Sequence, residues 1–372
     1  DIGTGSGFLA LLMAKAGAHK VTAVEVVPQF ARLATANVAR NKLSSTVTVV
    51  NCHSTDLKVP EVGGSSVEDD DQEEDEEAEV DEAHLSLPAD VLICELLDTG
   101  LLGEGCIAAI RDAVHRGLLK PNYRAIPSSA RVYVQIIDCP SAQQWSTLPP
   151  AIDPKRLSEG CAGASNGYES IHVGTSAERP ATRLRYMPLS PPLPIFDIDF
   201  ESLHTAQERH RSQTVVATQS GHASALLLWW DVKMHRDATS SETLSTHPHT
   251  TSTRDHWRQA VYPLASPLQV RKGDDELTVH CHHDDDDFWF DVKVNDADFE
   301  LPRNGQSYPR PLCTCGLHIG FSRYCMWATH DLIQRDLFAQ ALNKLVSQQR
   351  SFNSYFILGD SPLPSLVARQ QV

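Results

Sequence analysis

The chain has 372 residues, of which 41% are hydrophobic and 22% charged, a composition typical of a soluble globular protein with about two or three domains. No run approaches the roughly 18 apolar residues that a membrane-spanning helix needs, so we expect no membrane partner. The net charge of −16 argues against direct nucleic-acid binding, which requires a basic face. The nine cysteines are scattered and odd in number, which favours a reducing compartment.

The chain opens with DIGTGSGFLALLMAKAG, in which a glycine-rich turn leads directly into an apolar helix that ends at Gly17. Gly3 and Gly5 would let the backbone approach a ligand, and the helix N-terminus would offer it N–H groups. The strand VTAVEV follows, with Glu25 near its end, where an acid suits the two hydroxyls of a ribose. The sequence starts in what reads as the end of a strand, so we expect further residues before Asp1.

The glycine spacing distinguishes between cofactors. Dinucleotide-binding proteins use G-x-G-x-x-G, but the sixth position here is Phe8, and the spacing is G-x-G-x-G with Asp1 before it. This variant resembles the S-adenosylmethionine site of class I methyltransferases and argues against a nicotinamide dehydrogenase. A tight turn without a ligand is the alternative, and the position of Glu25 disfavours it.

Helices and strands continue to alternate up to residue 126. We expect a helix at 28–41, a strand at 46–51, a strand at 89–97 and a helix at 106–119. The segment HSTDL follows the strand at 46–51, where an adenine would lie in contact with the backbone near Ser54 or with the Asp56 side chain. This order predicts a mostly parallel sheet with helices on both faces.

An acidic segment interrupts this first domain. Residues 68–82 contain twelve acids and no base, so the rest of the chain carries only −16 + 12 = −4. Such a run repels itself, and we expect residues 61–87 to form a disordered surface insertion. An electrostatic trap for basic partners is the alternative interpretation.

Two glutamates bracket the segment CELLDTGLLGEG. Glu95 and Glu104 are nine positions apart, at the ends of a largely apolar loop that follows a buried strand. Glu95 would lie at the C-terminal end of that strand, where open α/β sheets bind ligands. The pair therefore indicates a clamp for a positively charged group. Asp98, inside the loop, either attracts basic residues that flank a target or caps a turn.

After Pro127 the helical rhythm gives way to alternating strands. We expect these strands at 131–138, 225–234, 277–283 and 288–294. Residues 141–180, between the first two, are rich in Pro, Ser, Ala and Gly. The second half of the chain is therefore a separate, mainly β region.

Together these motifs resemble those of a known family. CELLDTGLLGEG resembles the double-glutamate loop of protein arginine methyltransferases, and DIGTGSG, VEV and ADVLICELL stand around it in that family's order. TRDHWRQAVY resembles the family's threonine-histidine-tryptophan loop, with Asp255 in place of the threonine. RPLCTCGLHIGF resembles a linker between two modules. The chain is most similar to the two-module, monomethylating type of the family and looks truncated at both ends.

The resemblance implies a fold of class α/β plus β. Residues 1–126 would form a class I methyltransferase (Rossmann-like) parallel sheet domain that binds S-adenosylmethionine. Residues 127–308 would form a β-barrel substrate domain, with 141–180 in the place of a dimerisation arm. Residues 309–372 would begin a second, degenerate module, so that the full-length protein is a single-chain pseudo-dimer.

The resemblance also implies methyl transfer from S-adenosylmethionine to a guanidino nitrogen of arginine. The substrates would be basic, arginine-rich proteins such as histones or RNA-binding proteins, the product monomethylarginine, and the location the cytoplasm and nucleus. The expected site residues are Glu95, Glu104 and His256 for catalysis, Asp98 and Trp257 for the substrate, and Asp1, Gly3, Gly5, Glu25, Ser54 and Asp56 for the cofactor. His256 would relay a proton or pin the loop, although DHW is also compatible with a turn and a packed tryptophan. A catalytically inactive protein-binding scaffold of the same fold is the alternative function.

A compact set of cysteines and histidines stands after the predicted barrel. Cys313, Cys315 and His318 have a spacing that suits zinc, which prefers four nitrogen or sulfur ligands. The fourth ligand would be His282 or His283, because strand alternation lets only one of them face the others. A structural zinc site is the prediction, which the resemblance supports. The alternative is a pair of half-buried thiols with solvent-facing histidines.

Overall fold

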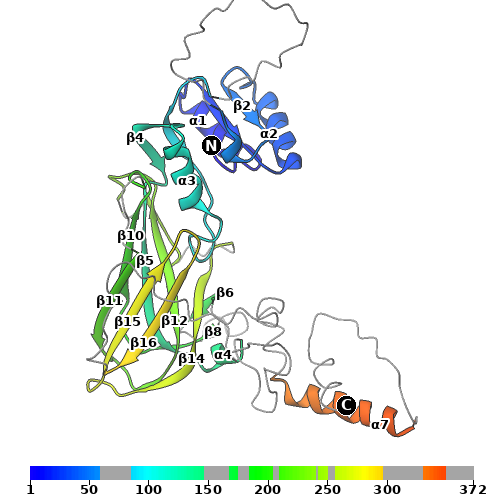
Figure 1. Cartoon of the computed structure of the whole chain (residues 1–372), viewed down its shortest axis with the longest axis vertical. Helices are drawn as coiled ribbons and strands as arrows, with labels where there is room; N and C mark the ends of the chain where they lie inside the picture. Colours follow the sequence, from blue (N-terminus) through cyan, green and yellow to red (C-terminus); the bar gives the residue numbers. More distant parts are fainter. Residues whose placement is uncertain are drawn as a thin grey trace, which may run out of the picture.

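The computed structural model describes residues 1–58, 85–145, 167–174, 184–203, 209–239, 242–249, 256–295 and 330–348. Figure 1 shows short helices and strands at one end of the molecule and long antiparallel strands extending away from them. Within the described residues, no helix is long and apolar enough to cross a membrane.

The first part contains parallel strands and helices, as the sequence predicts. Its elements are α1 Phe8–Lys15, β1 Val21–Val24, α2 Pro28–Arg40, β2 Val47–Val50, η1 Ser54–Asp56, β3 Ala89–Ile93, α3 Cys106–His115 and β4 Leu119–Ile126. β1 pairs in parallel with β2, and β3 with β4. Ile2 forms parallel bridges to both Val24 and Cys94, which joins the two pairs. The Rossmann-like arrangement is thereby confirmed.

One helix is shorter than the sequence predicts, and a strand takes its place. The expected helix at 106–119 ends at His115, because Gly117 adopts a φ of 69° and the Leu118 N–H turns back to the Ala113 carbonyl at 2.9 Å. β4 then begins at Leu119, within two residues of the glycine. This strand was not predicted.

The acidic insertion lies almost entirely outside the described residues. Its predicted range of 61–87 was too long at the C-terminal end, since residues 85–87 are placed. The Leu85 N–H donates to the Lys58 carbonyl at 3.0 Å, so the two ends of the segment meet. The insertion therefore enters and leaves the domain at one point.

The second part consists of two main antiparallel sheets. Its elements are β5 Ser129–Asp138, α4 Pro140–Gln143, β6 Glu169–Ile171, β7 Val173–Gly174, β8 Leu184–Arg185, β9 Met187–Pro188, β10 Leu193–Asp199, β11 His210–Val216, β12 Gly221–Lys233, β13 Thr243–Ser245, β14 Gln259–Val270, β15 Glu276–His283 and β16 Phe288–Val294. One sheet has the order β10-β5-β12-β14-β6, with β9 beside β5 and β13 beside β12; the other has the order β11-β15-β16. All four predicted strands are present, as β5, β12, β15 and β16. A separate helix, α7 Leu332–Gln348, lies near the end of the chain.

The two parts share one hydrophobic core. Leu101 and Ile107 of the first part are fully buried in the same cluster as Leu226, Trp230 and Phe288 of the second. This core places the segment between β3 and α3 against the antiparallel strands. Part of the predicted arm also belongs here, because β6 pairs with β14 in the larger sheet. Residues 146–166 and 175–180 of the arm lie outside the described residues, so the arm stays a prediction.

Candidate functional site

The glycine-rich turn has an unusual backbone and a close neighbour. Gly3, Gly5 and Gly7 have φ values of 74°, 53° and 81°, in the left-handed region that favours glycine. A Cβ atom on Gly3 would lie 2.9 Å from a side-chain carbon of Leu96. The turn therefore packs directly on the glutamate loop, by which we mean residues 94–105. α1 begins after Gly7, so its N-terminal N–H groups lie at the turn.

Glu25 lies at the end of β1 and holds the glycine turn. Its side chain is buried, and one carboxylate oxygen accepts the backbone N–H of Gly5 at 2.8 Å. The other oxygen accepts the N–H of Val27, also at 2.8 Å. Because a carboxylate has about four lone-pair positions, Glu25 retains acceptor capacity for the hydroxyls of a ribose.

Asp1 presents a carboxylate with one oxygen that lacks a donor. Oδ2 accepts the Thr4 hydroxyl at 2.5 Å, whereas Oδ1 is buried without a hydrogen-bond partner in the described part of the chain. A buried carboxylate oxygen without a donor is destabilising. The ammonium group of S-adenosylmethionine could supply that donor, so the residues present fit this cofactor.

Ser54 and Asp56 lie at the same edge of the sheet as Glu25. β1 and β2 run parallel and end at Val24 and Val50, and the Glu25 N–H donates to the Val50 carbonyl at 3.0 Å. The η1 turn after β2 buries Ser54 and leaves Asp56 exposed. The structure therefore brings the predicted cofactor residues to one edge, while their individual roles stay predictions.

The glutamate loop begins where β3 ends, and it carries an interacting set of acids. Burial, followed by the charge of Glu104, raises the pKa of Glu95. Burial, followed by the charge of Asp98, raises the pKa of Glu104. The loop thus brings Glu104 within electrostatic reach of both Glu95 and Asp98. Both glutamates are still exposed enough to meet a ligand.

Asp98 is fixed by two donors beside an acidic cavity. It accepts the Gly103 N–H at 3.1 Å and the hydroxyl of Tyr168. Burial and the bond to Asp98 raise the pKa of Tyr168, so the phenol remains a donor. The cavity has a volume of about 440 Å³ and is lined by Asp98, Gly100, Gly103, Gly167, Tyr168, Asp284, Asp286 and Asp287. Such a lining suits positively charged groups.

Trp257 and His256 lie next to the glutamate loop. Trp257 is buried, and its Nε1–H donates to the Leu97 carbonyl at 2.9 Å. The exposed ring of His256 packs on that of Trp257, with 4.6 Å between the ring centroids. A catalytic role for His256 and substrate contact by Trp257 stay predictions. Asp255 lies outside the described residues.

The proposed zinc ligands are only partly described. Cys313, Cys315 and His318 lie outside the described residues. His282 is buried in β15, between His210 at a centroid distance of 4.5 Å and Trp289 at 5.7 Å. Among the residues that the structure describes, no group of three or more histidines, cysteines or acids could hold a metal ion. The zinc site therefore receives no support from the structure.

Three residues that contact the loop were not predicted from the sequence. Tyr168 donates to Asp98, Ser170 lies 2.8 Å from Thr99 through their hydroxyls, and Trp230 donates to the Thr99 carbonyl. Tyr168 and Ser170 fall within the segment that was assigned to the arm. The adjacent tryptophans at 229 and 230 could have shown that their side chains face opposite sides of one strand, but not that Trp230 contacts Thr99.

Two family profiles match this chain. The profile described as arginine methyltransferase oligomerization subdomain matches residues 185–296, and that of ribosomal protein L11 methyltransferase (PrmA) matches residues 1–69. The chain is 31% identical to protein arginine N-methyltransferase 7 of Cricetulus longicaudatus, over 93% of the chain and 48% of that relative. It is 28% identical to the protein of that name from Drosophila melanogaster, over 99% of the chain and 52% of the relative. The chain therefore spans about half the length of the curated relatives it matches.

Two solved structures have a similar fold. One is the Arabidopsis thaliana protein arginine methyltransferase 10, described as uniquely open, with 21% identity and a TM-score of 0.54 over 80% of this chain and 84% of that one. The other is the Trypanosoma brucei PRMT1 enzyme-prozyme heterotetrameric complex with AdoHcy, with 20% identity and a TM-score of 0.55 over 81% and 83%. At these identities the likeness shows the fold alone.

Proposed function

We propose that this chain, which belongs to the protein arginine methyltransferase family, transfers a methyl group from S-adenosylmethionine to arginine side chains in protein substrates. The observation that carries the proposal is the direct packing of the glycine turn, which Glu25 holds through the Gly5 N–H, on Leu96 of the loop that bears Glu95 and Glu104. A cationic acceptor and a cofactor would then meet at one edge of the parallel sheet.

The acceptor requires two carboxylates for a chemical reason. A guanidinium has a pKa above roughly 12, and its charge spreads over three nitrogens, so it is a poor nucleophile. Glu95 and Glu104 can each accept hydrogen bonds from this planar group, which arginine forms in bidentate geometry. The pairing would orient one nitrogen and hold positive charge away from it. Orientation of this kind supplies about 7–11 kcal/mol of a barrier in favourable cases.

The proton leaves during or after transfer. Even with a raised pKa, the carboxylate of Glu95 or Glu104 is a far weaker base than is needed to deprotonate a guanidinium outright. The bond between the nitrogen and the methyl group must therefore begin to form before the guanidinium loses its proton. His256, beside the loop, would relay that proton or pin the loop. S-adenosylmethionine, when bound, supplies the methyl group. Asp1, Gly3, Gly5 and Glu25 would hold that cofactor, together with Ser54 or Asp56.

The substrate class follows from the charge beside the glutamate loop. The cavity at Asp98 is lined by aspartates from both parts of the chain. It supports basic, arginine-rich substrates such as histones or RNA-binding proteins, because a cation next to the target arginine would be attracted there. Monomethylarginine as the product rests on the resemblance to the two-module type.

Mass spectrometry of a basic arginine peptide tests the proposal. The full-length protein is incubated with the peptide and S-adenosylmethionine, and the expected product carries one added methyl group on arginine. A dimethylated product would overturn the monomethylation step alone. Cofactor binding by calorimetry without any methylated product would favour the protein-binding scaffold.

Three further expectations belong to the same proposal. The full-length protein would be a single-chain pseudo-dimer and would reside in the cytoplasm and nucleus. A structural zinc ion would join Cys313, Cys315 and His318 to His282, with no step of the reaction passing through it. Elemental analysis of the native protein and of a Cys313→Ser variant checks the metal: stoichiometric zinc lost in the variant is the expected result, and a metal-free native protein contradicts it.

A further inference from the structure

Two adjacent tryptophans on β12 face opposite sides of the larger sheet. Trp229 is 2% exposed and stacks on Tyr133, with centroids 5.6 Å apart and planes at 8°. Trp230 is fully buried in the core that both parts of the chain share. The two side chains are therefore matched in type, burial and sequence position but differ in the domain they contact.

Trp230 reaches across the core to the glutamate loop. Its Nε1–H donates to the Thr99 carbonyl at 3.2 Å. Trp257 donates in the same way to the Leu97 carbonyl at 2.9 Å. The two indole rings lie edge to face, with centroids 5.2 Å apart and an interplanar angle of 67°. Trp230 of β12 and Trp257, two residues before β14, thus take up two backbone carbonyls between Glu95 and Glu104.

The loop is held partly by its own turns and partly from outside. It has no helix or strand between Glu95 and Gly105, and internal bonds run only from the Leu101 N–H to the Asp98 carbonyl at 3.0 Å, from the Gly105 N–H to the Leu102 carbonyl at 2.9 Å and from the Gly103 N–H to the Asp98 side chain, among the bonds of the described residues. The carbonyls of Leu97 and Thr99 are taken up by the two indoles instead. Thr99 is 5% exposed, and its hydroxyl also lies 2.8 Å from that of Ser170 on β6. Leu101 is fully buried with a φ of 77°, a conformation that persists only where the surroundings impose it.

We propose that Trp230 is a positioning residue, which fixes the spacing of Glu95 and Glu104 by holding the Thr99 carbonyl. The inference rests on the proposed function, because the spacing matters only if a guanidinium binds between the two carboxylates. Trp230 touches neither substrate nor cofactor in this scheme. Its loss would change the rate of transfer more than it changes cofactor binding, since Glu25 and Asp1 lie on other elements.

The variant Trp230→Phe removes the N–H donor and keeps an aromatic ring in the core. Trp229→Phe is the matched control, because it makes the same change on the other face of the same strand. In the full-length protein we expect Trp230→Phe to lower kcat for an arginine peptide about tenfold, in line with the effect of small misplacements at a reacting centre. The Kd of S-adenosylmethionine should change by less than about twofold, which is small beside the tenfold change that about 1.4 kcal/mol of binding free energy produces. Trp229→Phe should change neither quantity beyond that range.

A double-mutant cycle separates positioning from loss of stability. Because the two indole rings are in contact, Trp230→Phe and Trp257→Phe should be non-additive in thermal stability in any case, so the cycle is read in kcat measured well below the unfolding temperature of every variant. If both indoles hold the loop, the effects of these two variants on kcat are not additive there, whereas those of Trp229→Phe and Trp257→Phe are. Thermal unfolding of each variant gives the stability change for comparison. Should Trp230→Phe fail to fold, Ser170→Ala removes a second contact to Thr99 from outside the core and should lower kcat in the same direction.

The outcomes distinguish the two proposals. A wild-type protein that binds cofactor but never methylates an arginine peptide would overturn the proposed function. An active wild-type protein in which Trp230→Phe and Trp229→Phe have equal effects on kcat would overturn the positioning role and leave the function standing. The positioning role is supported if kcat falls with Trp230→Phe but not with Trp229→Phe, and if the effect of Trp230→Phe on kcat is not additive with that of Trp257→Phe.

Discussion

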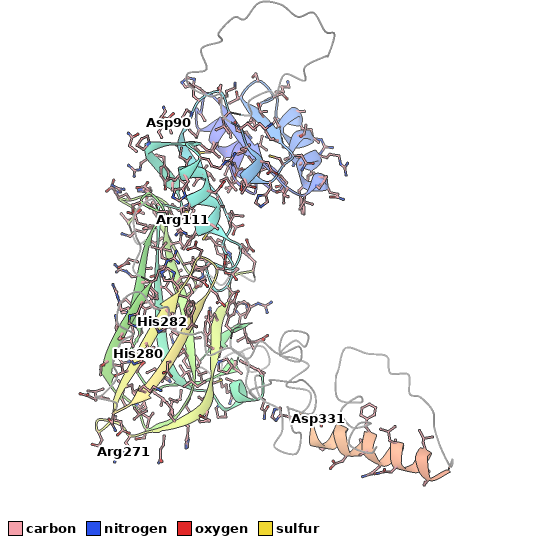
Figure 2. The ribbon with its side chains drawn as sticks, viewed as in Figure 1. Asp90, Arg111, Arg271, His280, His282 and Asp331 are labelled. Atoms are coloured by element: carbon pink, nitrogen blue, oxygen red, sulfur yellow. The ribbon has the colours of Figure 1, made fainter. Side chains whose placement is uncertain are left out.

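Arg111 of α3 donates to the carboxylate of Asp285, in the turn between β15 and β16. The other oxygen of Asp285 accepts from Arg209 at 2.7 Å. In Figure 2, Arg111 lies where α3 meets the antiparallel strands. Because α3 begins at Cys106, directly after the glutamate loop, this charged group joins the end of that loop to the second part of the chain.

Replacing Asp285 with asparagine should loosen this junction. The Asp285→Asn variant leaves Arg111 and Arg209 close together without an anion between them, so we expect the free energy of unfolding to fall by about 1 kcal/mol. Chemical denaturation at low and high salt measures it, and the difference should shrink at high salt.

The control for this variant breaks a pair within the first part of the chain. Asp90→Asn removes the partner of Lys120 in an exposed pair, where Asp90 is 75% exposed, and should have no measurable effect. Asp90 lies at the opposite end of β3 from the glutamate loop (Figure 2). Equal effects of Asp285→Asn and Asp90→Asn would show that the junction at Asp285 adds no stability.

Glu25→Gln should weaken cofactor binding and also destabilise the fold. An amide has one acceptor oxygen, so it cannot accept the N–H groups of Gly5 and Val27 as the carboxylate does. For cofactor binding, the hydrogen bond that is weakened is the one from a ribose hydroxyl to the charged carboxylate, and such a bond contributes about 1.5–3 kcal/mol. Since 1.4 kcal/mol is about tenfold in Kd, calorimetry should show that the Kd of S-adenosylmethionine rises at least about tenfold. An unchanged Kd with lowered stability would mean that Glu25 only holds the turn.

The acidic side of the activity profile should depend on Asp98. The clamp needs ionised carboxylates, and the pKa values of Glu95 and Glu104 are both raised, so kcat/KM should fall as pH decreases through those raised values. Asp98→Asn removes the charge that adds to burial at Glu104. The pKa of Glu104 then moves down towards its ordinary value, and the acidic limb moves to lower pH.

The sign of the stability change follows from the same shift. A raised carboxyl pKa means that ionisation is less favourable in the folded protein, so stability decreases as pH rises between the ordinary and the raised value. Asp98→Asn should make the free energy of unfolding fall less over this pH range, because the pKa of Glu104 is then raised less. Asp274→Asn is the control, in the exposed turn near Arg271 at the far end of the strands (Figure 2), and should leave the pH profile unchanged. An unshifted limb in Asp98→Asn would mean that its charge does not reach Glu104.

Local patterns were sufficient to predict much of the fold. A continuous apolar run at residues 225–230 located β12, which is buried on both faces, and the spacing of Glu25 from the glycines placed it at the turn, where the structure shows it bound to Gly5. The contacts of Trp230 and Ser170 with Thr99 were not predictable in this way. They depend on which strands pair and which face packs on the first domain, and such long-range pairing leaves no mark in a single local pattern.

The glutamate clamp itself is tested most directly by Glu95→Gln. The amide keeps the size of the side chain but loses its charge, so the guanidinium retains one anionic partner instead of two. Because removal of one preorganised charge-stabilising group typically lowers kcat about 100-fold or more, we expect methyl transfer to fall by at least that factor. Binding of S-adenosylmethionine should persist, since Glu25 and Asp1 are untouched.

Glu276→Gln, which makes the same change at an exposed position on β15, should behave as wild type. If the turnover of Glu95→Gln stayed within about threefold of wild type, the loss would be far below the fall of about 100-fold expected for a clamp. Glu95 would then be only a surface charge of the loop.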